Sequence, residues 1–589
     1  MPDPKVTRLL AALTVAAIFG SAVPGPMAAQ GSSHRKLDRV LQERATSAAG
    51  QSRVIIRLKK GVSRTAAKDA LKLLGVTSGR ILPIINGQAA SLPNAALAAV
   101  ANSPLVEHVS FDRVILGTME RTSAAIGAAA VRESLGLNGA GIGVAIVDSG
   151  ITAWHDDLGG APESSQRVDR FVDLVGQRAT AYDDYGHGTH VAGIVAGNGF
   201  DSEGRRTGIA PAARLIVIKA LDGNGQGRIS DVIAALDYIV ANKAALNIRV
   251  ANLSVSAPAY EPYDTDPLTL AAKRAVNAGI VVVAAAGNIG RSAQGTTLYA
   301  GVGAPGNAPW VVTVGASSHN GTIGRADDTI ASFSSRGPGA GGYAAKPDLV
   351  APGVGIESLS DPDSLFYTSR ASHLLTGTVP TPYIPYMSLS GTSMSAPVVS
   401  GTVALMLQAN PSLTPNQVKA ILQYTAEVNP DYDGLTQGAG FLNAKGAVEL
   451  ARYFADPSIG PRPQDASWGK RLIWGNYQYE GGALTRDASA WSTSVTWGDT
   501  ATAAGMPVAW GVTEGGDVER EWNVGAAVDN VVWGLTCGGS DCSGTWSSDA
   551  VLGTDTGDTV VWGMDELDTV VWGMNCLETK CTPVIWSDR

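Results

Sequence analysis

Four polar residues stand at places in this sequence where side chains can do chemistry. Asp148 ends the apolar run GVAIVD, His187 precedes a stretch of small residues, and Asn288 ends the apolar run IVVVAAAGN. Ser393 is one of five serines in MSLSGTSMSAPVVSG. Taken singly, each has an ordinary structural role, because aspartates form turns and serines cap helices. Taken together, they form a set that can do chemistry, because a histidine oriented by a carboxylate can make a serine hydroxyl nucleophilic.

The local sequences around these residues resemble the subtilisin-like serine proteases, the subtilase family. Four motifs occur in that family's order, VDSGI, GHGTHVAG, AAGN and GTSMSAP, with further matches at NLSVS and KPDLVAPG. The resemblance covers about residues 115–451. The order Asp, His, Ser along the chain separates this family from chymotrypsin-like enzymes and α/β-hydrolases. We therefore expect a serine protease that uses an Asp-His-Ser triad.

The resemblance implies a role for each of the four residues. His187 is expected to take the hydroxyl proton of Ser393 and later to give it to the leaving amine. Asp148 would orient the ring and stabilise its charged form. The side-chain amide of Asn288 and the backbone N–H of Ser393 are expected to form the oxyanion hole. A place at a helix start would also put the developing charge near the positive end of the helix dipole.

Three further segments resemble the family's substrate-binding segments. Two edge segments are expected to pair with the substrate backbone by strand addition, and they are Gly225-Gln226-Gly227 and Ser254-Val255-Ser256. The pocket for the side chain before the scissile bond is expected to be walled by Ala285-Ala286-Gly287. Where the family usually has Ser-Leu-Gly, this chain has a serine at 256, which adds bulk near the pocket mouth. The long segment 354–387 is expected to form an extra loop beside the site.

The sequence raises two questions about metals. His190 follows His187 by three residues, but no glutamate lies between them as in the HExxH motif, which disfavours a zinc site. Calcium is usual in the family, and HDDL at 155–158 resembles the family's HPDL, whose aspartate is often a ligand. Asp157 with the loop near Asn198 would supply the oxygen ligands that calcium requires. We expect no cofactor in catalysis and leave a structural calcium ion open.

A scaffold for these residues is visible between about Gly141 and Phe454, where apolar runs alternate with helical patterns. The runs are GVAIVD, ARLIVIKAL, RVANLSVS, IVVVAAAGN and WVVTVGAS. Near-continuous apolar strands separated by helices predict a three-layer α/β fold with a mostly parallel, subtilisin-like sheet. In such sheets functional sites lie beyond the carboxyl ends of the strands, which is where Asp148 and Asn288 stand.

A smaller unit precedes this scaffold. Residues 53–115 show the order β-α-β-β-α-β, which is typical of the ferredoxin-like pattern. Subtilases that resemble this chain carry a propeptide of that fold, which assists folding and blocks the cleft until self-cleavage. We therefore assign 53–118 to an inhibitory propeptide and 119–455 to the peptidase domain. The cut is expected between Ile115 and Ser123.

The composition changes again after the peptidase domain. In residues 456–589, named here the Trp-Gly extension, the dipeptide WG occurs at Trp468, Trp474, Trp497, Trp510, Trp533, Trp562 and Trp572. Alternating threonine, valine and tryptophan with glycine breaks predicts short β-hairpins or a repetitive β layer. A partly disordered, acidic extension is the alternative. The tryptophans would bind a surface or a glycan, or fill a small core.

The termini bear on location. Lys5 and Arg8 precede an apolar run at 9–23, which predicts a secretory signal peptide at 1–29 followed by a linker at 30–52. The run is short for a membrane anchor, the alternative. In an exported protein the four cysteines favour disulfides, first within CGGSDC and within CLETKC, with a four-thiolate zinc site as the alternative. These cysteines are Cys537, Cys542, Cys576 and Cys581.

The overall expectation is a secreted serine endopeptidase that forms an acyl-enzyme and is made as a self-processed precursor. Its partners would be polypeptide substrates and its own propeptide. A net charge of −9 disfavours nucleic acid, and no membrane span is expected in the mature chain. Two rival hypotheses are an exopeptidase or peptide ligase with the same triad, and a catalytically silent surface-binding protein that acts through its WG region.

Overall fold

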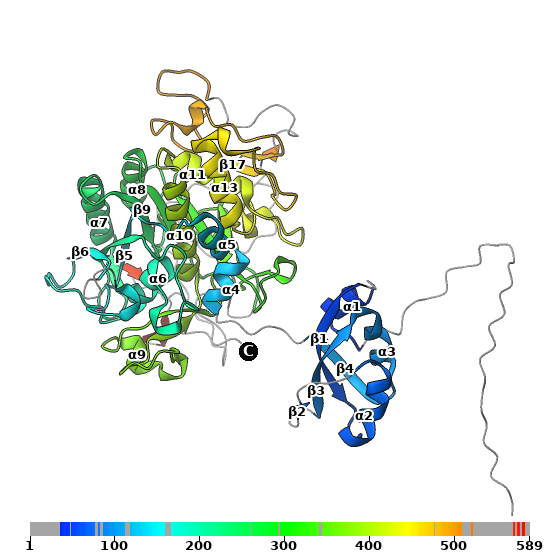
Figure 1. Ribbon diagram of the computed structural model, residues 1–589. Helices are drawn as coiled ribbons and strands as arrows, with labels where there is room; N and C mark the ends of the chain where they lie inside the picture. The colour runs from blue at the N-terminus through cyan, green and yellow to red at the C-terminus, as the bar shows by residue number, and fades with distance from the viewer. Residues whose placement is uncertain are drawn as a thin grey trace, which may run out of the picture. The chain divides into compact units, whose positions relative to one another are not determined.

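The computed structural model in Figure 1 falls into two compact units, Met1–Ile115 and Leu116–Arg589. The described residues are 36–46, 49–76, 81–82, 86–111, 118–159, 166–259, 261–292, 295–340, 344–475, 477–508, 520–521, 569–571, 574–577 and 580–583. The predicted signal peptide and the CGGSDC motif lie outside them. Among the helices of these residues, none combines the length and the apolar character needed to cross a membrane.

The N-terminal unit has the predicted order of strands and helices. Its elements are α1 (Arg39–Ala45), β1 (Gln51–Leu58), α2 (Arg64–Leu73), β2 (Ile81–Leu82), β3 (Gly87–Pro93), α3 (Leu97–Asn102) and β4 (Val106–Phe111). The sheet order is β2-β3-β1-β4, and β1 pairs antiparallel with both of its neighbours. Val54, Ile56 and Leu58 of β1 are buried while alternate residues are exposed or half-buried, as a strand with one face on a core requires.

The linker prediction for 30–52 is wrong in its described middle part. Residues 39–45 form α1, which Asp38 caps by accepting a hydrogen bond from the Leu41 N–H at 2.9 Å. Leu37 and Leu41 are buried in the core of the N-terminal unit. The segment therefore folds with that unit, because Leu41 of α1 and Leu37, which forms a β-bridge with Val109 just ahead of the helix cap, bury against an apolar surface that local sequence does not reveal.

The larger unit is built on an eight-stranded, mostly parallel sheet. Its main order is β12-β11-β10-β9-β5-β7-β6, and β13 also pairs with β11. The strands are β5 (Gly143–Asp148), β6 (Val168–Asp173), β7 (Arg214–Lys219), β9 (Ile248–Leu253), β10 (Val281–Ala285), β11 (Val312–Ser318), β12 (Thr329–Ile330) and β13 (Leu349–Pro352). All six residues of the central strand β5 are buried, as expected for a strand covered on both faces. The predicted α/β fold is confirmed.

Helices flank this sheet. They include α4 (Thr118–Ala125), α5 (Ala128–Leu135), α6 (His187–Ala196), α7 (Ile229–Asn242), α8 (Pro267–Asn277), α10 (Thr392–Ala409), α11 (Pro415–Thr425), α12 (Gly434–Gln437) and α13 (Ala444–Ala455). Helices α7 and α8 pack on each other, while α10 packs on α6, α13 and strands β9, β10 and β11. Residues 392–407 of α10 are all buried, so this helix is a rigid part of the core.

The long segment 354–387 folds into a small sheet rather than an irregular loop. Strands β14 (Ile356–Leu359), β15 (Leu374–Leu375) and β16 (Tyr386–Leu389) pair in the order β14-β16-β15, with helix α9 (Leu365–Ser369) between β14 and β15. The Leu365 N–H donates to the Asp184 carbonyl at 2.9 Å, and the Phe366 N–H donates to the Tyr185 carbonyl at 3.1 Å. The segment therefore contacts the loop that leads into α6.

The first part of the Trp-Gly extension packs on the peptidase core. The Trp474 indole N–H donates to the Asp499 carbonyl at 3.0 Å, and the Trp497 indole N–H donates to the Ile473 carbonyl at 2.8 Å. The two rings lie 4.6 Å apart between centroids, and both are buried. Asn416 of α11 binds the carbonyl of Ala490 at 2.8 Å. Trp474 and Trp497 therefore fill a core. Their burial is possible because each indole N–H has a carbonyl acceptor.

Three strands near the C-terminus are also described, β20 (Thr569–Val571), β21 (Met574–Leu577) and β22 (Lys580–Pro583). Strands β21 and β22 pair antiparallel, with Cys576 opposite Cys581 in the register. Residues that lie opposite each other across two strands are near enough in backbone position for a local disulfide. The predicted pairing within CLETKC stays a prediction, as does the pairing within CGGSDC.

Candidate active site

The four predicted catalytic residues come from four elements of the larger unit. Asp148 is the last residue of β5, and Asn288 follows the end of β10 by three residues. His187 is the first residue of α6, and Ser393 is the second residue of α10. Helices α6 and α10 pack on each other. Two strand ends and two helix starts thus meet at the carboxyl edge of the sheet, where parallel α/β folds place their sites.

Asp148 and His187 form a buried pair. The Nδ1 of His187 lies 2.8 Å from the Oδ1 of Asp148, and the side chains are 6% and 0% exposed respectively. The Ser149 N–H donates to the same oxygen at 2.7 Å, so the carboxylate is fixed by its own backbone. A carboxylate that binds Nδ1 sets the orientation of the ring and leaves Nε2 for proton exchange.

The loop before α6 is held by Asp183, which sequence reasoning missed as a positioning residue. Its Oδ1 accepts hydrogen bonds from the Gly186 N–H and the Ser149 hydroxyl, each at 2.8 Å. Its Oδ2 accepts the N–H of Thr189 at 2.8 Å. One carboxylate therefore satisfies free donors at the start of α6 and ties them to the residue after Asp148. A carboxylate four residues ahead of a helix start is the signal that points to such a cap.

A close backbone approach explains one glycine of the GHGTH motif. A Cβ added at Gly188 would lie 2.2 Å from the carbonyl oxygen of Gly150, a contact that no side chain tolerates. The Gly188 N–H also donates to the Ser149 hydroxyl at 2.9 Å. Helix α6 therefore meets the loop after β5 at backbone distance, which brings His187 within reach of Asp148.

Ser393 lies next to one of the predicted substrate segments. Its side chain is buried, and its hydroxyl lies 3.4 Å from the carbonyl oxygen of Ser254. The Ser254 hydroxyl in turn donates to the Ser393 carbonyl at 2.9 Å. These two contacts fix the start of α10 against the end of β9, with the nucleophile candidate at the junction.

Thr392 orients the amide of Asn288, and sequence reasoning missed this residue too. The N–H and the hydroxyl of Thr392 both donate to the Oδ1 of Asn288, each at 2.9 Å. Because the amide oxygen is bound on one side, the amide NH₂ is directed to the other. A Cβ added at Gly391 would lie 3.3 Å from that nitrogen, which places it alongside the start of α10. The NH₂ group is thus available as a donor beside the Ser393 N–H.

The other predicted substrate segments border the same place. The Gly287 N–H donates to the Thr392 hydroxyl at 3.1 Å, so the Ala285-Ala286-Gly287 wall abuts α10. A Cβ at Gly225 would lie 2.5 Å from the ring of Tyr185, whose centroid is 6.5 Å from that of His187. The structure therefore brings all three predicted segments to the edge where the four catalytic candidates meet. Ser256 is half-buried beside Gly303.

His190 does not belong to this group. Its Nε2 lies 3.0 Å from the Met387 carbonyl oxygen and 3.1 Å from that of Ile356, so the ring is turned towards the small sheet. Burial, with a smaller effect of His187, lowers the pKa of His190 to about 3. A neutral, hydrogen-bonded core histidine fits these contacts, and the expectation against a zinc site in GHGTH stays a prediction.

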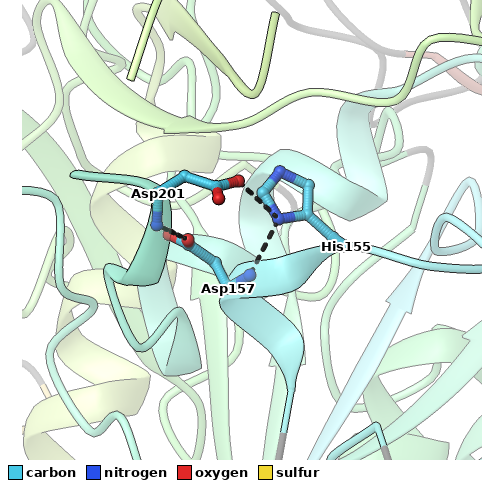
Figure 2. Close-up of side chains that lie close together, drawn as sticks. All are labelled: His155, Asp157 and Asp201. Carbon is cyan, nitrogen blue, oxygen red and sulfur yellow. Dashed lines mark hydrogen bonds and ion pairs between the residues drawn. The ribbon is translucent and has the colours of Figure 1, made fainter. Parts of the chain in front are cut away.

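A second polar cluster surrounds Asp157 (Figure 2). The Asn198 N–H donates to the Asp157 carbonyl at 2.8 Å, so the predicted loop does lie beside Asp157. The loop also brings Asp201, which sequence reasoning did not name, and its N–H donates to the Asp157 Oδ1 at 2.8 Å. The hydroxyl of Tyr386 donates to the other oxygen of Asp157, also at 2.8 Å.

Asp201 is the unusual member of this cluster. Its side chain is fully buried, and neither carboxylate oxygen has a hydrogen-bond partner within the described part of the chain. Burial, with the nearby charge of Asp157, raises the pKa of the Asp201 carboxyl to about 7. A buried carboxylate without partners requires a proton or a cation.

The donor set tests whether calcium fits here. Two adjacent carboxylates suit a hard cation. His155 does not, because its Nδ1 accepts the Asp157 N–H at 3.1 Å and its Nε2 lies 2.9 Å from the Pro385 carbonyl oxygen. The Nδ1 of His155 also lies 3.9 Å from the Oδ2 of Asp201. In Figure 2 dashed lines join the His155 ring to both Asp157 and Asp201. From this cluster, therefore, only the oxygens of Asp157 and Asp201 suit the cation, and they are part of the about six to eight oxygen ligands that calcium takes.

Known proteins match this chain over the part that contains the four catalytic candidates. A protein-family model described as "Subtilase family" matches residues 139–447, which include all four catalytic candidates. "Serine protease AprX" of Bacillus subtilis strain 168 is 40% identical over 323 residues, 54% of this chain and 68% of that protein. "Extracellular serine proteinase" of Thermus sp. strain Rt41A is 31% identical over 374 residues, 61% of this chain and 77% of its own. "Subtilisin E" of Bacillus subtilis strain 168 is 30% identical over 417 residues, 69% and 93% respectively.

Proposed function

This chain belongs to the subtilase family of serine-type endopeptidases, and we propose that it is a secreted member, made as a precursor that cuts itself from its N-terminal unit. The observation that carries the proposal is the buried Asp148–His187 pair, 2.8 Å between Oδ1 and Nδ1, beside the helix start that bears Ser393. The sequence adds the predicted signal peptide at 1–29 and a small unit ahead of the peptidase fold.

In the proposed reaction, the Ser393 hydroxyl oxygen attacks the carbonyl carbon of the scissile peptide bond while the Nε2 of His187 takes the hydroxyl proton. The C–N bond then breaks, and His187 passes that proton to the leaving amine. The acyl group stays on the Ser393 oxygen until water, deprotonated by His187, attacks it and releases the acid. Asp148 keeps Nδ1 protonated throughout and stabilises the charged ring.

The negative oxygen of each tetrahedral intermediate would bind two donors, the Asn288 amide and the Ser393 N–H. Thr392 fixes the amide before substrate arrives, so no reorganisation is needed as charge develops. The Ser393 N–H is one of the free amides in the first turn of α10, where the helix dipole favours negative charge.

The self-cleavage site can be narrowed within the predicted interval 115–123. Helix α4 begins at Thr118, and the side chain of Met119 is fully buried in the core of the larger unit. Thr122 and Ser123 are buried too. A cut inside α4 would need this helix to leave the core, so we expect the new N-terminus between residues 115 and 118.

The experiment that tests the proposal is labelling of the secreted protein with a serine-directed fluorophosphonate, followed by mass spectrometry of the labelled peptide and of both termini. We expect the label on Ser393 and a mature chain that starts between residues 115 and 118. Digestion of a long peptide should give internal cuts, whereas an exopeptidase would trim an end and a ligase would join fragments. Folded mature protein that takes no label would instead favour the silent surface-binding protein.

We also propose a structural calcium ion held by the carboxylates of Asp157 and Asp201. The buried Asp201 oxygens without hydrogen-bond partners in the described structure support it. Calcium at about 100 times its Kd stabilises a protein by about 2.7 kcal/mol, so for a mature chain of this size we expect Tm to rise by about 3 °C over protein in a chelator. The measurement is a thermal melt of mature enzyme stopped by the fluorophosphonate, so that self-digestion does not contribute.

Two variants complete this measurement. Asp201→Asn keeps the shape of the side chain but removes its charge, and it should melt at the same temperature with calcium and with chelator. Asp237→Asn, on the exposed face of α7, is the control and should keep the full calcium shift. A calcium shift that survives Asp201→Asn, or the absence of any shift in the unsubstituted enzyme, would contradict this site.

A further inference from the structure

One strand of the C-terminal extension lies on the edge that is expected to bind substrate. Strand β8 (Gln226–Arg228) pairs antiparallel with β20 (Thr569–Val571). In the register, Thr569 is opposite Arg228, Val570 is opposite Gly227, and Val571 is opposite Gln226. Within the described residues β8 has no other strand partner. The edge that a substrate backbone would extend is therefore occupied by the chain itself.

The direction of β20 matches that of a segment heading for the catalytic residues. Val571 lies opposite the end of β8 that follows Gly225. A Cβ at Gly225 would touch the ring of Tyr185, and that ring is next to His187. Strand β20 therefore begins opposite Arg228 and ends, at Val571, opposite Gln226. Gln226 is at the end of β8 nearer to His187. Strand addition reads backbone rather than side chains, so a segment of the chain can take the place of a substrate.

The sequence of this segment is repeated. DTVVWGM occurs at 558–564 and again at 568–574, and the related DNVVWGL occurs at 529–535. We name these three stretches the tail repeats. Adjacent valines favour the extended conformation that an added strand needs. Each tail repeat also has an aspartate just before the residue equivalent to Thr569.

We propose that the tail repeats are intramolecular competitors for the substrate-binding edge β8, so that the mature enzyme works below its full affinity while the extension is attached. The proposal rests on the proposed endopeptidase function, because only an enzyme that binds peptides along β8 can be inhibited there. Three copies raise the chance that one of them occupies the edge, without any new contact. The competitor is local and reversible, unlike a propeptide that must be cut away.

The size of the effect follows from tethering. A pairing of three residues is weak for a free peptide, but attachment to the same chain gives an effective concentration that can reach about the millimolar range. Such a competitor raises the apparent KM and leaves kcat unchanged. We expect removal of the pairing to lower KM by about fivefold, with kcat within about a factor of two, because excess substrate displaces a tethered segment.

The test keeps the full chain and removes only the ability of the tail repeats to pair with β8. Neighbouring residues of a strand direct their N–H groups to opposite sides, so one of Val570 and Val571 must face β8. Proline at both positions removes that donor whichever it is. The equivalent pairs Val560 and Val561, and Val531 and Val532, are changed in the same chain, since the copies can replace one another. The control chain carries threonine at these six positions, which keeps the N–H groups and the β-branched side chains.

Three measurements on mature enzyme decide between the outcomes. KM for a long peptide should be about fivefold lower in the proline chain than in the unsubstituted chain, with kcat within about a factor of two, and the threonine chain should match the unsubstituted one. In enzyme stopped by the fluorophosphonate, the amides of residues 226–228 should exchange with solvent faster in the proline chain. Intact mass shows whether the tail repeats are still attached.

Equal KM values and equal exchange in the proline and threonine chains would overturn the proposal. So would an unsubstituted mature enzyme that is active but has lost the tail repeats, because a competitor must remain attached. The labelling of Ser393 keeps this separate from the proposed function. If Ser393 takes the label and peptides are cut while KM is unchanged, only the competitor is refuted; if no variant takes the label, the peptidase proposal itself fails.

Discussion

Replacement of Ser393 by alanine is expected to lower kcat by roughly 10⁶-fold, a magnitude measured in subtilisin, a member of the same family. The same change should leave an uncleaved precursor, visible as a band of higher mass, because the nucleophile that would cut between the two units is gone. The physical reason is that His187 and Asp148 have no function without a hydroxyl to activate. Peptide hydrolysis by purified protein and a denaturing gel of the secreted material are the two measurements.

Ser395 provides the matched control for this experiment. It lies two residues further along α10, is fully buried, and its hydroxyl has no hydrogen-bond partner within the described structure. Ser395→Ala should therefore mature normally and keep kcat within about twofold, with no loss of stability, because no hydrogen bond is removed. Normal maturation of Ser393→Ala would refute self-processing, and a comparable loss in Ser395→Ala would show that the effect reflects damage to α10.

The scaffold of the site could be predicted from sequence because its signals are local. The runs that became β5, β7, β9, β10 and β11 are almost continuously apolar, which happens when both faces of a strand are covered. Asp148 and Asn288 follow two of those runs directly, so their place at one edge of the sheet followed from the parallel arrangement. The start of α10 near Ser393 was also marked, by the small residues around it.

Positioning residues could not be found in this way, because their partners are distant along the chain. Thr392 acts on an amide 104 residues away, and the Asp201 N–H donates to the carboxylate of Asp157, 44 residues away. Asp183 is nearer to its partners, but its function depends on how α6 approaches the loop after β5. The burial of Leu37 and Leu41 also depends on distant partners, since a short helix and the leucine ahead of its cap can be assigned to a core only once that core is known.

The Trp-Gly extension shows how one motif can have two structural settings. Trp474 and Trp497 are buried in a core against α11, where each indole N–H has a carbonyl acceptor. Strand β20, in contrast, belongs to a tail repeat and pairs at an edge through its backbone. The repeat of WG in the sequence suggested one common layer, but neighbours decide the role of each copy: α11 is available to the first copies and β8 to a later one.

Asn288→Ala is expected to lower kcat by about 10²–10³-fold, equivalent to about 3–4 kcal/mol of barrier, a range that includes the loss of such a donor in subtilisin. KM should change by less than about threefold, because the amide binds an oxygen that is negative only in the tetrahedral intermediate. Precursor processing should slow in parallel, since the same donor serves that cut. The measurement is kcat and KM for one peptide, together with the rate at which mature protein appears.

Variants at Thr392 separate donation from positioning. Thr392→Ser keeps the hydroxyl that binds the Asn288 oxygen and should retain most of kcat. Thr392→Val keeps the N–H bond at 2.9 Å but loses the hydroxyl bond, so the amide is held by one contact rather than two. We expect an intermediate loss in kcat of about tenfold, because a donor that must reorient gives up part of its preorganised stabilisation. In the Asn288→Ala background the change to valine should cost little more, since no amide is left to orient. Additive losses in the double variant would show that Thr392 acts independently of Asn288, through the packing of α10 or through the Gly287 N–H.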